Sequence, residues 1–133
     1  MFHKATDCGA LAEATAQAER LIDAVQTSAQ GSPDDLREMA DAVERGGAVI
    51  AEKPIREAKL KELQGDLVRM YGEFAATLRT AADEWVELEK KVEADPSALP
   101  EMEQWGGEFE IQMEQYIARD DELIESMNRY CQR

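Results

Sequence analysis

One apolar stripe runs through the middle of the chain, in steps that alternate between three and four residues for almost its whole length. Its members are Leu60, Leu63, Leu67, Met70, Phe74, Leu78, Ala81, Trp85, Leu88 and Val92. That spacing places these side chains on one face of a single α-helix. The stripe therefore predicts a long helix over residues 55–94, approaching ~60 Å in length at ~1.5 Å per residue, that packs against other helices.

A shorter helix is predicted before the stripe, over about residues 6–29. Apolar residues recur there at the same three-four spacing. Thr6 or Asp7 is the expected N-cap, because a short polar side chain can accept a hydrogen bond from the first turn. Gln30 and Gly31 are the expected stop, since glycine favours the end of a helix.

A second helix is predicted over residues 33–51. Ser32 is its expected N-cap and Pro33 occupies the first helical position, where the missing N–H does no harm. Gly46 and Gly47 weaken this helix by roughly 1 kcal/mol each. The pair is therefore either a stop or a soft spot within a continuing helix.

The fourth predicted helix covers residues 100–131. It follows the clearest loop of the sequence, which runs from Asp95 to Pro100. Pro54 separates the second helix from the third, because a residue before proline is pushed out of helical geometry.

Short connections between amphipathic helices favour antiparallel neighbours. We therefore predict an all-α antiparallel bundle that forms one domain over residues 1–133, most simply with four helices in up-down-up-down order. Three helices result instead if the second and third form one bent unit. The third and fourth helices are much longer than the first two, so the extra length either protrudes as a hairpin or is covered by a second copy.

Two cysteines, Cys8 and Cys131, lie near opposite ends of the sequence. In the four-helix order both come to the same end of the bundle, where a disulfide would contribute ~4 kcal/mol through loop entropy. Two buried thiols are the alternative. A disulfide indicates an oxidising compartment, and so an exported protein whose leader is absent from this chain. Free thiols favour the cytoplasm.

The chain is acidic, with a formal net charge of −14. Residues 95–133 hold ten acidic and three basic residues, a balance of −7. Such a surface repels phosphate groups and anionic lipids, so we expect no binding to nucleic acid. No window approaches the ~20 apolar residues of a membrane span, so we expect no membrane insertion. A basic protein is the electrostatically natural partner.

The sequence offers no arrangement typical of catalysis, metal binding or cofactor binding. His3 is the only histidine, which removes Glu-x-x-His di-metal motifs, zinc sites and histidine-dependent nucleophiles. Asp120 is a carboxylate within an apolar stripe, between Tyr116 and Ile124. It needs a partner such as an arginine or a tyrosine hydroxyl, and structural pairing or a register role is favoured over a ligand site.

Two short motifs lie in the fourth predicted helix. Trp105-Gly106-Gly107 contains Trp-x-Gly, and Tyr116 to Asp120 is Tyr-x-x-x-Asp. Together they resemble the two signatures of the Trp-x-Gly family of small secreted helical hairpins, over about sixteen residues. In that family the first motif lies in the hairpin turn and the second lies beyond the second helix. Here the motifs are eleven residues apart, and we do not adopt the resemblance.

We therefore expect a non-enzymatic protein that binds another protein or associates with itself. A chaperone that binds a client helix is one alternative, and an acidic inhibitor or immunity-type protein that blocks a basic partner is another. The expected contact surfaces are the protruding hairpin and the region of Trp105 and Phe109. Gly65 and Gly72, seven residues apart and opposite the stripe, mark a candidate homodimer contact.

Overall fold

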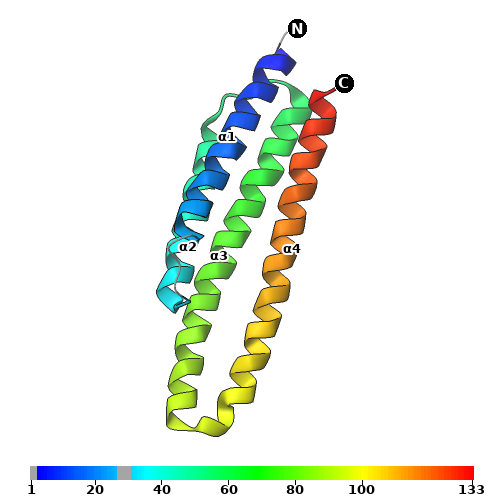
Figure 1. Cartoon of the computed structure of the whole chain (residues 1–133). Coiled ribbons are helices and arrows are strands. Elements are labelled where there is room, and N and C mark those ends of the chain that lie inside the picture. The colour runs from blue at the N-terminus through cyan, green and yellow to red at the C-terminus, as the bar shows by residue number, and fades with distance from the viewer. Residues whose placement is uncertain (1–2, 27–30) are drawn as a thin grey trace.

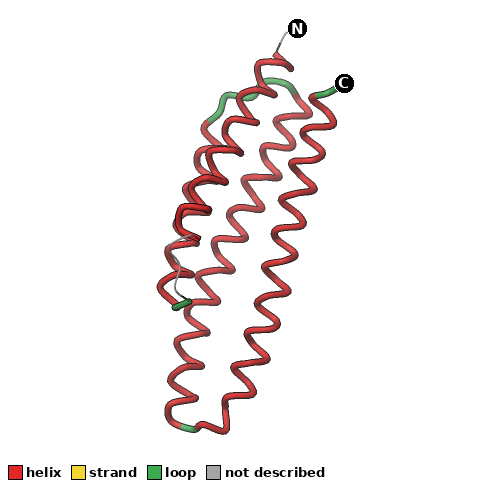
Figure 2. Tube along the Cα trace, viewed as in Figure 1, coloured by secondary structure: helices red, strands yellow, loops and turns green. Residues whose placement is uncertain are grey.

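Four α-helices make up the protein in a computed structural model that describes residues 3–26 and 31–133. They are α1 (His3–Gln26), α2 (Pro33–Glu52), α3 (Ala58–Ala94) and α4 (Leu99–Cys131), with a short 3₁₀-helix, η1 (Pro96–Ala98), between α3 and α4. Consecutive α-helices run antiparallel, and both chain ends lie at the same end of the bundle (Figure 1). Helices and loops are the only structures in the described residues (Figure 2). The predicted all-α bundle of four helices is confirmed; the predicted end of the first helix, residues 27–29, lies outside the described ranges.

Most of the core lies between α1, α2 and α3. Helix α2 packs against both α1 and α3, whereas α4 packs mainly along α3 and touches α1 lightly. The largest fully buried side chains are Leu11, Val43, Ile50, Leu60, Leu67, Met70 and Leu78. In α4, which the structure describes in full, Met127 is the only buried side chain. Helix α4 is therefore an arm attached to a three-helix core.

The glycine pair of α2 allows three helices to pack closely. An added Cβ at Gly46 would lie 3.0 Å from the Cβ of Ala18 on α1 and 3.0 Å from the Cε2 of Tyr71 on α3. An added Cβ at Gly47 would lie 3.2 Å from the Cβ of Tyr71. Helix α2 continues through both glycines to Glu52, so the stop considered at this pair is wrong. Packing against the bare backbone offsets the weak helix propensity of glycine.

Asp7 is buried within α1 and serves a distant part of the chain. Helix α1 already includes His3, so the predicted N-cap at Thr6 or Asp7 is wrong. The side chain of Asp7 accepts hydrogen bonds from the backbone N–H groups of Arg56 and Glu57, both at 2.8 Å. These two bonds hold the pKa of Asp7 below its usual value. Asp7 therefore fixes the connection between α2 and α3 against α1.

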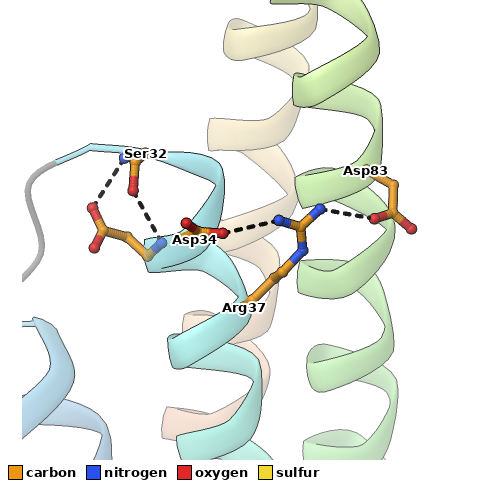
Figure 3. A network of polar contacts seen from close by, with 5 residues as sticks. Ser32, Asp34, Arg37 and Asp83 are labelled. Carbon is orange, nitrogen blue, oxygen red and sulfur yellow. Dashed lines mark hydrogen bonds and ion pairs between the residues drawn. The ribbon is translucent and has the colours of Figure 1, made fainter.

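Both ends of α2 are capped by side chains. Ser32 Oγ accepts a hydrogen bond from the backbone N–H of Asp35 at 3.2 Å, and Asp35 Oδ2 accepts one from the backbone N–H of Ser32 at 2.9 Å (Figure 3). The predicted cap at Ser32 is confirmed. At the other end, Gln64 of α3 donates to the carbonyls of Ile50 at 2.8 Å and Lys53 at 2.9 Å. These bonds satisfy backbone groups that a helix end leaves unpaired.

Arginines link the surfaces of α2 and α3. Arg37 pairs with Asp34 on its own helix at 3.0 Å and with Asp83 on α3 at 3.2 Å (Figure 3). Arg79 of α3 pairs with Asp41 of α2 at 3.0 Å. Exposed pairs of this kind contribute ~0–1 kcal/mol each, so they set the register of the two helices more than their stability.

Helices α3 and α4 project beyond α1 and α2 as a two-helix hairpin (Figure 1). The burial of the central stripe follows this geometry, because Trp85, Leu88 and Val92 near the hairpin end are only half-buried. Lys91 of α3 donates to Glu101 of α4 at 2.6 Å near the tip. The extra helix length therefore protrudes, and its coverage by a second copy stays a prediction.

The opposite end of the bundle is closed by a disulfide between Cys8 of α1 and Cys131 of α4, with Cα atoms 6.0 Å apart. Beside it, the Tyr130 hydroxyl donates to Glu57 Oε1 at 2.5 Å. The ammonium of Lys4 lies 4.4 Å from the centroid of the Tyr130 ring. The end of α4 is thus held to α1 and to the start of α3.

Candidate binding groove

An open groove of about 460 Å³ runs along α3, between α1 and α2 on one side and α4 on the other. Its floor consists of Met70, Tyr71, Phe74, Leu78 and Trp85 of α3. Its apolar walls are Ile22 of α1, Leu36 and Met39 of α2, and Phe109, Met113, Tyr116 and Ile117 of α4. The groove exists because α1 and α4 separate below the end that carries the chain termini (Figure 1).

Side chains of α4 hold its wall of the groove against the floor. The ring of Tyr116 stacks on that of Phe74, with centroids 4.9 Å apart and planes 12° apart. The hydroxyls of Tyr116 and Thr77 share a hydrogen bond of 2.8 Å. Arg119 of α4 donates to Glu73 of α3 at 2.6 Å. The groove is therefore preformed, with its α4 wall fixed by aromatic, hydroxyl and ionic contacts.

Carboxylates stand at one end of the groove. Asp120 of α4 and Glu19 and Asp23 of α1 line it. Burial, together with the negative charges of Glu19 and Asp121, raises the pKa of Asp120 to about 6. Asp120 Oδ1 is buried and has no hydrogen-bond partner within residues 3–26 and 31–133. The arginine or tyrosine partner that the sequence led us to expect for Asp120 is absent from this part of the chain.

Tyr71 lies within the electrostatic influence of Asp120 and Glu19 at this acidic end. It is 3% exposed, and burial together with the charges of Asp120 and Glu19 raises the pKa of its hydroxyl. Tyr71 therefore stays neutral at any physiological pH. It supplies an apolar surface to the groove and no compensating charge to Asp120.

An aromatic cluster closes the other end of the groove, toward the hairpin tip. The ring of Trp105 stacks on Phe109 with centroids 5.6 Å apart and lies 5.9 Å from the ring of Trp85. Trp105 Nε1 donates to Glu84 at 3.1 Å. The Nε1 of Trp85 is buried without an acceptor in the described residues. Trp105 and Phe109, expected as a contact surface, are thus partly engaged with α3 and line hollows beside it.

The other candidate contact residues lie elsewhere. Gly65 and Gly72 are exposed on α3, and beyond the neighbouring backbone of α3 itself no described atom lies within 4 Å of a Cβ added at either position. No helix among the described residues approaches them, and they do not line the groove. A homodimer contact at these glycines stays a prediction.

The two short motifs of α4 occupy different surroundings. Trp105-Gly106-Gly107 lies inside α4 and does not interrupt it. Tyr116 and Asp120 both line the groove. This placement differs from the hairpin turn that the Trp-x-Gly family uses for its first motif.

The walls that α1 and α2 contribute were missed by sequence reasoning. Ile22, Leu36 and Met39 lie on apolar helix faces, and periodicity assigns such residues to a core. In the structure they are half-buried and line the groove. Periodicity alone does not separate the wall of a groove from a core face.

The described residues offer few groups that could catalyse a reaction or bind a metal ion. His3 is exposed, with its Nδ1 3.5 Å from a guanidinium nitrogen of Arg56. No group of three or more His, Cys, Asp or Glu side chains there is placed to hold a metal ion. Among the same residues, no helix combines the length and apolarity needed to cross a membrane.

The fold and the groove define a class: a small all-α antiparallel bundle with an open apolar groove and a disulfide between its first and last helices. Comparison of the chain with known protein families, with curated protein sequences and with solved structures found no match. The function is therefore argued from the groove itself.

Proposed function

We propose that this protein is a non-enzymatic module that binds another protein through the groove along α3. The observation that carries the proposal is the apolar lining of that groove, contributed by all four helices and left open. Helices of partner proteins dock their apolar faces into hydrophobic grooves. Covering the groove would remove apolar surface from water, at about 25 cal/mol per Å².

Ile117 shows that the lining is accessible. Its side chain is 57% exposed on the α4 wall of the groove. Half-buried residues of α1 and α2 face it across the groove. The lining is therefore open to contact by another molecule.

A chaperone that binds a client helix is the narrower version of this function, and the same groove supports it. An inhibitor-type protein that blocks a basic partner is the second candidate. A hollow near the hairpin tip favours it, where Glu84, Glu87 and Glu101 surround Leu88 and Trp105. An acidic hollow with an apolar centre suits a cationic side chain of a partner.

The disulfide supports a site of action in an oxidising compartment. Such bonds persist in extracytoplasmic environments and are rare where thiols are kept reduced. We therefore include an extracytoplasmic location in the proposal.

Ile117 and Ile111 form a matched pair for testing the groove. Both lie on α4 and are 57% and 56% exposed, but only Ile117 lines the groove. A photo-reactive residue at position 117 should form adducts with a partner protein in the native cells, whereas one at position 111 should not. Equal adducts from the two positions, or no adduct from position 117, would contradict binding through the groove.

A further inference from the structure

The groove has the length of a short helix. Its floor extends from Met70 to Trp85 along α3, which is about 22 Å at ~1.5 Å per residue. Its α4 wall extends from Phe109 to Asp120. A helix of about 15 residues has the same length, and amphipathic helices dock into grooves through apolar residues at three-four spacing.

The acidic end of the groove adds a charge requirement. Asp120 and Glu19 lie at this end and interact electrostatically, and Asp120 Oδ1 has no donor in the described residues. Oδ1 itself is closed to the surface, so an occupant reaches the Asp120 carboxylate through the part of it that lines the groove, where a cationic partner forms the stronger hydrogen bond. An occupant that covers this end therefore needs a positive group at the level of Asp120.

A second copy of the chain does not meet this requirement. Each copy carries a net charge of −14, so two facing copies would bring like charges together. The surroundings of the groove are acidic on both walls, with Glu19 and Asp23 on α1 and Asp120 on α4. Charge complementarity thus favours a different chain with basic residues.

We propose that the groove binds an amphipathic α-helix of another protein that carries one lysine or arginine within its apolar face, paired with Asp120. The apolar residues of that helix lie on the floor between Met70 and Trp85, and its cation lies between Asp120 and Glu19. This inference rests on the proposed function and adds the chemistry of the partner.

A peptide series tests the proposal directly. The parent is a 16-residue helical peptide with an apolar face of leucine and norleucine and an uncharged polar face. Each derivative carries one lysine in place of a residue of the apolar face, scanned over every such position. Binding to the protein is measured by calorimetry at two salt concentrations. We expect the peptide with lysine at one particular position to bind about tenfold more tightly than the parent peptide.

Variants of the protein locate the effect. Asp120→Asn should abolish the tenfold difference between the best lysine peptide and the parent peptide. Ile117→Glu should prevent binding of all the peptides, whereas Ile111→Glu, at an equally exposed position outside the groove, should not. Thermal unfolding of each variant checks that it is folded.

The outcomes separate this inference from the proposed function. Equal binding of parent and lysine peptides, still blocked by Ile117→Glu, overturns the basic residue but leaves the groove as a binding site. Octylammonium that binds as tightly as the best peptide overturns the helix in favour of a small amphiphile. Self-association that Ile117→Glu abolishes, with no peptide binding, assigns the groove to a second copy. Peptide binding blocked equally by both glutamate variants rejects the groove.

Discussion

Removal of the disulfide should lower the free energy of unfolding by about 5 kcal/mol. The bond joins residues that are 123 positions apart. Worked for this separation, the loop-entropy model gives about 5 kcal/mol at 25 °C, somewhat more than the ~4 kcal/mol expected from the sequence. Cys8 and Cys131 are themselves half-buried, so their replacement by alanine removes little packing. The loss should therefore come from the unfolded state.

Urea unfolding of the oxidised protein and of the Cys8→Ala, Cys131→Ala double variant measures this loss. The variant should have a lower midpoint and a larger m value, since its unfolded chain exposes more surface. Hydrogen exchange should also accelerate in the last turns of α4. The structure describes all of α4, and Met127 is its only buried side chain. Equal midpoints for the two proteins would refute the loop-entropy argument, and an unchanged exchange pattern in α4 would refute the idea that the disulfide holds the end of α4 in place.

Two further predictions concern the helix packing and the buried carboxylate. Gly46→Ala should destabilise the protein by up to about 2 kcal/mol, because the added Cβ would lie 3.0 Å from Ala18 and Tyr71. Gly65→Ala, where the added Cβ has open space, should stabilise the protein by about 0.5–1 kcal/mol. Thermal unfolding that reverses this order would contradict the close packing at Gly46. Asp120→Asn should leave the free energy of unfolding unchanged near pH 4 and raise it by about 1–2 kcal/mol at pH 7.5. This is about half of the free energy that the full pKa difference would give, because Asp120 is only partly buried and solvent screens its charge. The raised pKa of Asp120, about 6 against 3.8, means that the folded state retains a proton which the unfolded state releases, so the stability of the natural protein falls as pH rises through this window. A difference between the two proteins that does not vary with pH in chemical denaturation would contradict that assignment.

Local signals in the sequence predicted local structure well. The cap at Ser32 depends on groups three residues apart, and the central stripe depends on a period of a few residues. Asp7 shows where such reasoning ends. As a short acidic residue near a helix start it fits an N-cap, but its hydrogen-bond partner at Arg56 is 49 residues away. No local pattern can encode a bond over that separation.

Glycine propensity misled for a related reason. The weakness of Gly46 and Gly47 in an isolated helix is real, but in α2 the missing side chains admit Ala18 and Tyr71 from neighbouring helices. Tertiary packing then outweighs propensity. The sequence would have revealed this only together with knowledge of which helices cross at that level.

The groove lay beyond reach of periodicity for a different reason. Met70 and Phe74 belong to the same stripe, yet Met70 is 1% exposed and Phe74 is half-buried. The difference arises from where α1 and α4 separate, and the spacing of apolar residues carries no information about that separation. Asp120 was visible as an irregularity in a stripe, but its missing partner became apparent only when Glu19 and Asp23 were placed on the facing wall.

The same carboxylates give a reason why the groove stays open. Helix α4 is fixed at one end by the disulfide and at the other by the short connection through η1, so it could approach α1 only by bending in the middle. Such a movement would bring Asp120 closer to Glu19 and remove both from water. Like charges in a less polar environment repel strongly, so this repulsion opposes closure of the groove. In the complex proposed above, a cation of the partner would cancel that repulsion and so favour an occupant of that charge.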